Sequence, residues 1–435
     1  MNLPLVSLLA LFIAILISSF TRLNVGLLSI ALAFIIGVLL GGLKIQEIIA
    51  GFPTSMFLTL VAITLLFSQA KVNGTLDKIS KLAIKLARGN AGLIPMIFFA
   101  LALIISSIGP GNIAATALLA PVAMAVAGRA GISAFLMAIM VCNGANAGTF
   151  SPFAPTGIIA NDLMSKIGLD GFEWQNYFNT LLAQSFVAFA GYFVLGGLKL
   201  FTKRAAALDE SFQQKIDPFD AKQKLTLGVI AALVISVVLF KIDVTLGAFI
   251  GVMVLSLSNA ADEKAAIQAI PWHTLLMVSG ATMLIALIDK TGGMDLFTNM
   301  LAEFSSATTI TAVIAFVTGV ISVYSSSSFV VMPAFLSAIP KLIEKLGGGD
   351  PLAIAYSINV GAHLVDVSPL STLGALCIAN AAESENRNAL FHWMLAWGLS
   401  MCLVGAIVCF IFWGCAERKF AKIISEIVFR KYKKD

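Results

Sequence analysis

The stretch GANAGTFSP, residues 144–152, lies in the middle of a long apolar segment and combines glycine, proline and hydroxyl residues. A related stretch, GAHLVDVSP at residues 361–369, follows 217 positions later (361 − 144 = 217). In both copies a glycine stands five residues after the proline, at Gly157 and Gly374. Broken helices at matching places in two halves of a membrane chain point to a transporter's binding site. The pattern predicts a duplicated fold with an interrupted helix in each copy.

Composition places the chain in a lipid bilayer. It has 435 residues, of which 59% are hydrophobic and 12% charged, with a mean hydropathy of +0.96. Soluble domains carry about 25% charged residues. The many apolar runs of about 18 residues or more each match one helical crossing, which excludes a monotopic enzyme and a β-barrel. We expect an all-α polytopic membrane protein, with the first stretch, residues 1–20, retained as a helix.

Two apolar stretches, 91–127 and 308–340, are too long and too interrupted for one helix. The first carries Gly109-Pro110-Gly111 at its middle, and the second carries the serine run 325–328. A polar turn there predicts a re-entrant hairpin, whose tip must be buried in protein or line a watery cavity. Two ordinary, closely spaced helices remain the alternative.

Other residues extend the match between the halves. Pro53 matches Pro271 and Asp77 matches Asp295, both displaced by 218 positions. Each half then reads as three spans, a hairpin, a broken helix (133–164 or 352–381) and a final span. Five crossings per copy give ten in all, and an odd number inverts the second repeat. The predicted divisions are a first repeat at 1–200, a cytoplasmic linker at 201–222, a second repeat at 223–415 and a basic tail at 416–435.

Basic residues predict the orientation. The net charge is +5, and the side that holds the linker carries fifteen basic loop residues against six on the other. The positive-inside bias makes that side cytoplasmic. The seven basic residues of the tail do not fit this orientation, because ten crossings place the tail on the outer side of the membrane. We expect no nucleic-acid partner. The amphipathic segments 75–88 and 294–304 are interfacial connectors or solvated helices.

The interruptions gather polar side chains that could bind a carboxylate as donors or Na⁺ through oxygen lone pairs. Helix packing is the alternative role, since hydroxyl residues are common at membrane helix contacts. The expected substrate- or ion-binding residues of the first half are Asn112, Thr116, Asn143, Asn146, Thr149, Ser151 and Thr156. Those of the second half are Ser325, Ser326, Ser327, Ser328, His363, Asp366, Ser368, Ser371 and Thr372.

Asp366 replaces Thr149 of the first copy, and His363 replaces Asn146. An ionisable residue inside a membrane is costly and usually functional. We expect Asp366 to help bind the coupling cation, Na⁺ or H⁺, with a possible Na⁺ near Asn112 and Asp366; a buried structural pair with His363 is the alternative. No basic residue is predicted deep in the membrane. An anion would be held by helix N-termini, amides and hydroxyls, and the cation would balance its charge.

Other classes of protein find little support. The five cysteines form no C-x-x-C pair and suit a buried core, and we expect no cofactor. The three histidines lie in separate segments without a metalloprotease motif, so we expect no catalytic residues and no enzyme. No phosphate-binding G-x-x-x-x-G-K-[ST] loop is present to use ATP. A channel suits hairpins that close from opposite sides less well than a transporter does.

These features resemble the ion transporter superfamily, particularly its divalent-anion/sodium symporters. The stretch from Leu3-Pro4 through Gly109-Pro110-Gly111-Asn112 to residues 144–149 is more similar to malonate-type (MatC) dicarboxylate carriers. The resemblance implies an elevator-type permease for small dicarboxylates or related organic anions, often a homodimer, coupled to Na⁺ or H⁺ in the bacterial inner (plasma) membrane. A sodium/proton antiporter or inorganic-anion exporter of the same superfamily is the alternative.

Overall fold

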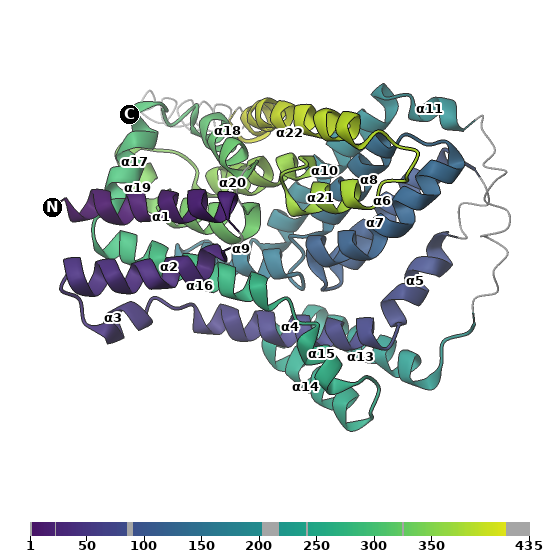
Figure 1. The fold of residues 1–435 in the computed structure, drawn as a ribbon. Coiled ribbons are helices and arrows are strands. Elements are labelled where there is room, and N and C mark those ends of the chain that lie inside the picture. Colours follow the sequence, from purple (N-terminus) through teal and green to yellow (C-terminus); the bar gives the residue numbers. More distant parts are fainter. Residues whose placement is uncertain are drawn as a thin grey trace, which may run out of the picture.

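The computed structural model describes residues 2–21, 23–84, 90–201, 217–240, 242–323 and 326–414. Every element in these ranges is helical, as the composition predicts (Figure 1). Most of the predicted linker, 202–216, and the tail from residue 415 lie outside the described residues.

The helices of the two halves follow one another in the same order. Those of the first half are α1 (Leu3–Phe20), α2 (Val25–Phe34) continued by η1 (Ile35–Leu40), α3 (Ile45–Ile49), α4 (Thr54–Val72), α5 (Thr75–Ile84), α6 (Leu93–Ser107), α7 (Gly111–Ala130), α8 (Ala134–Gly148), α9 (Pro155–Lys166), α10 (Glu173–Val194) and α11 (Gly197–Leu200). Those of the second half are α13 (Ala221–Phe240), α14 (Val244–Leu257), α15 (Glu263–Gln268), α16 (Trp272–Lys290), α17 (Gly293–Glu303), α18 (Ile310–Ser322), η4 (Ser327–Val331), α19 (Met332–Leu346), α20 (Pro351–Leu364), η5 (Val365–Val367), α21 (Thr372–Ala379), α22 (Arg387–Cys409) and η6 (Phe410–Gly414).

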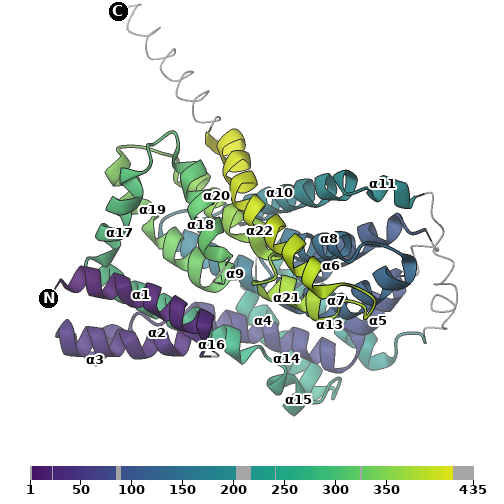
Figure 2. The same cartoon turned by 45° about the horizontal axis from the view of Figure 1, so that its top comes forward.

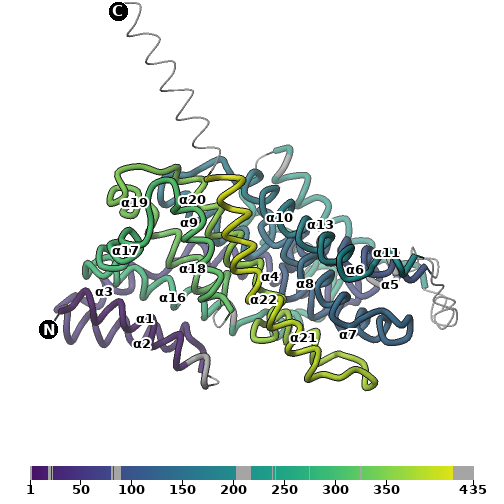
Figure 3. Tube along the Cα trace, turned by 90° about the horizontal axis from the view of Figure 1, so that it is seen from above, coloured from purple at the N-terminus to yellow at the C-terminus, as the bar shows by residue number. Residues whose placement is uncertain are grey.

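The halves pack on each other reciprocally. Helices α1, α2 and α3 of the first half lie against α16, while α14 and α15 of the second half lie against α4 (Figures 1 and 2). In the same way α7 packs on α21 and α19 packs on α9. Seen from above, α22 crosses the molecule, and it contacts α18, α20 and η5 (Figure 3). The core therefore forms between the halves as well as within each.

Both predicted turns of the long apolar stretches are present. Helices α6 and α7 join through residues 108–110, where Gly109 has φ +145°. A Cβ at Gly109 would lie 1.7 Å from the ring of Phe67, so no larger residue fits this turn. In the second half α18 ends at Ser322, and the chain re-enters a helix at η4, whose first turn is capped by Ser326.

The repeated motif breaks both helices where expected. Helix α8 ends at Gly148 and α9 begins at Pro155, while α20 passes through η5 before α21 begins. A Cβ built on Gly157 would lie 2.0 Å from the carbonyl oxygen of Ser151, and one on Gly374 would lie 2.0 Å from that of Ser368. The glycine of each copy is therefore required by the same close approach of the returning backbone.

Helix lengths agree with an integral membrane protein. Among the described residues, four helical stretches are long and apolar enough to cross a bilayer: Thr54–Val72, Gly111–Ala130, Pro351–Ala379 and Arg387–Gly414. The pair α16 and α17, bent by 87°, makes a fifth if counted as one span, and further apolar helices have 10–17 residues. The count of ten crossings stays a prediction. Helix α7 is by itself long enough to cross a bilayer. Two ordinary transmembrane helices therefore remain an alternative to the first hairpin.

Candidate functional site

A buried hydrogen-bond network joins the first turn to the first broken helix. Asn112, in the first turn of α7, donates from Nδ2 to Oδ1 of Asn146 near the end of α8, at 2.7 Å. The side chain of Asn112 is 5% exposed and that of Asn146 is fully buried. The Pro-Gly turn starts α7 at this depth, and the Gly-rich motif ends α8 beside it. Two amides expected in the first-half cluster are therefore hydrogen-bonded to each other.

Asn146 also connects the two copies of the motif. Its Nδ2 donates to the backbone carbonyl of His363, at 3.0 Å, and to Oδ2 of Asp366, at 3.2 Å. His363 is the residue that replaces Asn146 in the second copy. One amide thus links the break after α8 to the break after α20.

The second turn completes the network. Ser327 donates its hydroxyl to Oδ1 of Asp366 at 2.6 Å, and Ser328 lies 2.8 Å from Nε2 of His363. Thr156, in the first turn of α9, donates to the hydroxyl of Ser328 at 3.0 Å. All four interruptions therefore meet at one place in the molecule.

The hydrogen bonds of His363 define the form of a neutral imidazole. Its Nδ1 lies 2.8 Å from the backbone carbonyl of Asn359, which can only accept. Nδ1 must then carry the hydrogen, so Nε2 accepts from the hydroxyl of Ser328. The ring of Phe150 packs edge-on against His363, with centroids 4.8 Å apart. The imidazole is held in place from three sides.

Asp366 is a buried carboxyl group without a cationic partner in the described part of the chain. It is 6% exposed and receives side-chain hydrogen bonds from Ser327 and Asn146. The ion pairs formed by described residues do not include it. Burying an isolated carboxylate is costly, so such a group either takes up a proton or acquires a cation. The charge of an ionised Asp366 is therefore not balanced by any cationic side chain among the described residues.

Three expected oxygens of the first half have no hydrogen-bond partner among the described residues. They are the hydroxyls of Thr116 and Thr149 and Oδ1 of Asn143, all on fully buried side chains. Unpaired buried oxygens are rare, and a bound cation or water commonly explains them. Thr149 is the counterpart of Asp366. The first copy therefore has a hydroxyl without a hydrogen-bond partner where the second copy has a hydrogen-bonded carboxyl group.

Several expected residues shape the breaks instead of joining the network. Ser151 and Ser368 accept at 3.3 Å from the backbone amides of Phe153 and Leu370, so they form equivalent turns. Ser326 caps η4, and Ser371 caps α21 and also donates to the backbone oxygen of Asp366. Thr372 is exposed, and Ser325 lies outside the described residues.

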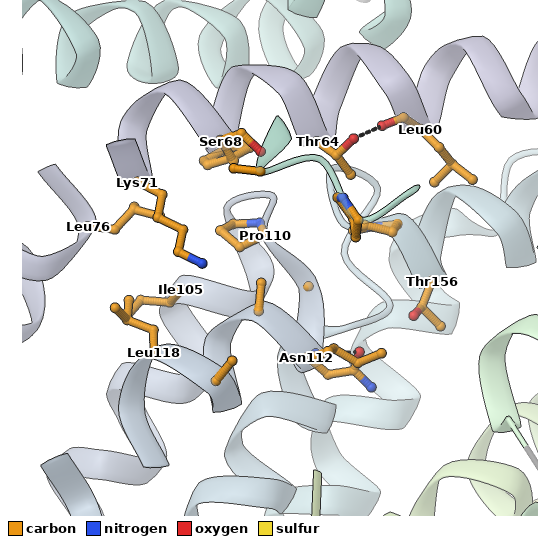
Figure 4. A pocket seen from close by; sticks show the side chains of 18 of the residues that line it. Leu60, Thr64, Ser68, Lys71, Leu76, Ile105, Pro110, Asn112, Leu118 and Thr156 are labelled. Atoms are coloured by element: carbon orange, nitrogen blue, oxygen red, sulfur yellow. Dashed lines mark hydrogen bonds between the residues drawn. The ribbon is translucent and has the colours of Figure 1, made fainter. Parts of the chain in front are cut away.

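A cavity of about 240 Å³ adjoins the network on the side of the first turn (Figure 4). Asn112 and Thr156 line it at one end, and Lys71 and Leu76 line it at the other. Most of its wall is apolar, and α4, α7 and the start of α9 contribute much of it. Its remaining lining residues are Leu60, Thr64, Phe67, Ser68, Ile105, Pro110, Gly111, Ile113, Ala114, Ala117, Leu118, Pro155, Ala269, Pro271, Leu275 and Phe329.

Lys71 is the lining residue that sequence reasoning missed. It was counted only as a loop charge for orientation, although it belongs to the last turn of α4. The 218-residue displacement that relates Pro53 to Pro271 also relates Lys71 to Asp289. Asp289 lies 2.7 Å from the ammonium of Lys341 on α19, which also lies 3.4 Å from Asp295. The sequence therefore contains a signal for Lys71, because a basic residue in the first half matches an acidic residue, Asp289, in the second.

The comparable region of the second half is nearly closed. A cavity of about 30 Å³ lies among α1, α16, α17, α18, η4 and α19, and every lining residue is apolar. Elsewhere in the described core, Cys142 and Cys377 are free thiols with their sulfurs 3.6 Å apart. No group of three or more His, Cys, Asp or Glu side chains suited to a metal ion is found in the described ranges.

Comparison with known proteins confirms the resemblance seen in the sequence. Residues 1–149 match the family model of the dicarboxylate carrier protein MatC N-terminus. The first third of the chain is therefore similar to MatC-type carriers, and we call it the MatC-type region. It contains Asn112 and Asn146, whereas Thr156 of the same network lies beyond it. The sequence has no match among curated proteins.

Two solved structures have a similar fold. The YdaH transporter of Alcanivorax borkumensis is 15% identical, with a TM-score of 0.55 over 84% of this chain and 86% of that one. MtrF of Neisseria gonorrhoeae, described as illuminating a class of antimetabolite efflux pumps, is 13% identical, with a TM-score of 0.55 over 85% and 83%. At these identities the similarity is one of fold. Together with the similarity of residues 1–149 to a dicarboxylate carrier, this shared fold supports a membrane transporter.

Proposed function

We propose that this protein is a secondary active transporter that moves small dicarboxylates or related organic anions across the bacterial inner membrane, coupled to Na⁺ or H⁺. The observation that carries the proposal is the meeting of both turns and both broken helices in one network beside the 240 Å³ cavity. The MatC-type region supports the dicarboxylate class, since the matched family is that of a dicarboxylate carrier.

The substrate anion has donors at the wall of the cavity. Helix α7 begins at Gly111, and Pro110 supplies no side-chain cap, so the amides of Gly111 and Asn112 and the side-chain amide of Asn112 lie beside the space. The amide of Ile113 already donates to Oδ1 of Asn112 at 2.9 Å. Free amides at a helix N-terminus favour a carboxylate. Thr156 adds a hydroxyl from the first turn of α9. The apolar remainder of the wall suits the short carbon chain of a small diacid.

The coupling cation would bind where buried oxygens lack a positive partner. Asp366 can take a proton or face a Na⁺, and the unpaired oxygens of Thr116, Asn143 and Thr149 are hard ligands of the kind Na⁺ accepts. Uptake of a divalent anion is electrically costly on its own. Binding a cation at the same network would offset that charge in the step that moves the substrate.

We further propose ten crossings and two re-entrant hairpins in two inverted repeats, working as an elevator in a homodimer with the linker cytoplasmic. The shared order of helices and the reciprocal packing of the halves support two copies of one fold. The resemblance to divalent-anion/sodium symporters supports the elevator and the dimer.

Reconstituted protein tests the function directly. Proteoliposomes would be assayed for uptake of labelled malonate and succinate, with and without an inward Na⁺ gradient and with and without a pH gradient. We expect uptake that one of the two gradients accelerates at least several-fold. Absence of uptake for every small dicarboxylate tested would contradict the proposal.

A cation antiporter or inorganic-anion exporter is the second candidate, because Asp366 and His363 lie in one buried network where a cation would bind without any substrate. Counterflow separates the two functions. Labelled malonate should accumulate in vesicles preloaded with unlabelled malonate if the protein is a dicarboxylate carrier. Sodium-driven proton movement that is indifferent to malonate would favour the antiporter.

A further inference from the structure

The cavity extends from the network to a lysine on a different helix. Asn112 and Thr156 lie at the network end, whereas Lys71 comes from the last turn of α4 and directs its ammonium group into the cavity (Figure 4). Lys71 is exposed, so this end of the cavity reaches the surface of the protein. A ligand that fills the space would touch the α7 tip and α4 together.

Lys71 is the one charged residue in the cavity wall within the described part of the chain. Two other lysines have side-chain partners: Lys78 donates to Gln223 at 2.7 Å, and Lys341 pairs with Asp289. For the ammonium group of Lys71 no hydrogen bond or ion pair with another described residue is found. A positive charge facing a largely apolar cavity, with no acidic residue in its wall, selects for an anionic group.

We propose that Lys71 binds the second carboxylate of a dicarboxylate whose first carboxylate is held at the α7 tip by Asn112 and Thr156. This inference rests on the proposed function and deepens it. It makes Lys71 the residue that distinguishes a diacid from a monoacid. The tip alone serves both kinds of ligand, but only a diacid places a charge opposite the ammonium group.

The second half has no equivalent anchor. Its matching position is Asp289, which Lys341 neutralises, and the nearby cavity of about 30 Å³ is wholly apolar. Lys71 lies on the face that holds the linker, because the turn after α4 is tied to α13 by Asn73, which donates to Thr226 at 2.8 Å. The second carboxylate is therefore recognised from the linker face alone.

A purely structural role for Lys71 would not depend on which ligand occupies the cavity. A lysine in the last turn of a helix interacts favourably with the helix dipole, whatever the cavity contains. Lys290 is the matched control, since it occupies the last turn of α16, the counterpart of α4, and donates to the backbone of Glu47 at 3.1 Å. It does not line the cavity.

The test compares Lys71→Gln, Lys71→Arg and Lys290→Gln with the wild-type protein in proteoliposomes. Half-saturating concentrations would be measured for malonate and for monomethyl malonate as inhibitors of labelled malonate uptake. We expect Lys71→Gln to raise the value for malonate about three- to fivefold, as for a charge pair that stays partly in water, and to leave the monoester unchanged. Lys71→Arg should restore most of the discrimination, and Lys290→Gln should retain all of it.

Sidedness sharpens the test. Vesicles of defined orientation should show the effect of Lys71→Gln when malonate is offered to the linker face and not from the other face. Equal losses for the diacid and the monoester, no loss for either, or the same loss in Lys290→Gln would overturn the assignment while leaving dicarboxylate transport in place. If the wild-type protein transports no dicarboxylate, the proposed function itself is wrong and this inference falls with it.

Discussion

The two copies of the motif share a backbone and differ in what they leave unpaired. In the first copy the hydroxyl of Thr149 has no partner among the described residues, and a cavity of about 240 Å³ lies beside the turn. In the second copy Asp366 has hydrogen bonds to both carboxyl oxygens, and the comparable cavity is about 30 Å³. The comparison teaches that one scaffold places an unpaired hydroxyl beside a large cavity in one copy and a hydrogen-bonded carboxyl group in the copy with the smaller cavity.

The glycines after the two prolines test whether the copies are structurally equivalent. Because a Cβ at Gly157 or Gly374 would lie 2.0 Å from a backbone oxygen, alanine at either position should destabilise the protein by about 3 kcal/mol or more. We expect both variants to lose most of the folded protein, measured by size-exclusion chromatography and thermal unfolding in detergent. Gly228→Ala is the control, since nothing lies within 4 Å of its Cβ position. Tolerance at only one of the two sites would show that the breaks are not equivalent.

Asp366→Asn tests the chemical difference between the copies. The variant keeps the size of the side chain but removes its capacity to carry a charge, so we expect substrate uptake to fall about ten- to hundredfold. The measurement is initial uptake under a Na⁺ gradient and under a pH gradient. Asp289→Asn, at an exposed carboxyl far along α16, should keep its response to both gradients. Unchanged ion coupling in Asp366→Asn would remove this residue from the transport mechanism.

Lys341→Gln tests whether ion pairs hold the second side closed. Lys341 joins α19 to Asp289 and Asp295, but these side chains are 30%, 58% and 53% exposed, so the loss should be no more than about 1 kcal/mol. We expect a small decrease in melting temperature that disappears in about 1 M salt, because salt screens exposed charges. Lys166→Gln, which breaks a pair with Asp162 inside one helix, is the control. Equal shifts in both variants would argue against a role in docking α19.

Local chemistry explains what the sequence predicts well. Glycine and proline limit the backbone over a few residues, so the turn at residues 109–111 and the breaks before Gly157 and Gly374 appear where expected. The sequence predicts two polar clusters, with Asn112 and Asn146 in the first half and Ser327 and Asp366 in the second. The hydrogen bond from Asn146 to Asp366, which joins the clusters, depends on tertiary packing.

Side-chain direction and tertiary contacts limit the rest. Lys71 was read as a loop charge, since the end of a helix near the membrane surface does not reveal whether a side chain faces solvent or a cavity. Thr372 is exposed although its neighbour Ser371 caps α21, because successive residues of a helix point about 100° apart. The number of crossings depends on tilt and depth, which no periodicity of residues determines.

The amide of Asn146 has a consequence for energetics. It accepts from Asn112 of its own copy and donates to His363 and Asp366 of the other. A ligand that draws Asn112 away alters the same amide that stabilises the carboxyl group of Asp366. If a ligand bound at Asn112 changes the affinity for a cation at Asp366, the cation changes the affinity for that ligand by an equal factor, as thermodynamic reciprocity requires. A single planar group can thus couple cargo to driving ion over one side chain's length, with no relay through distant helices.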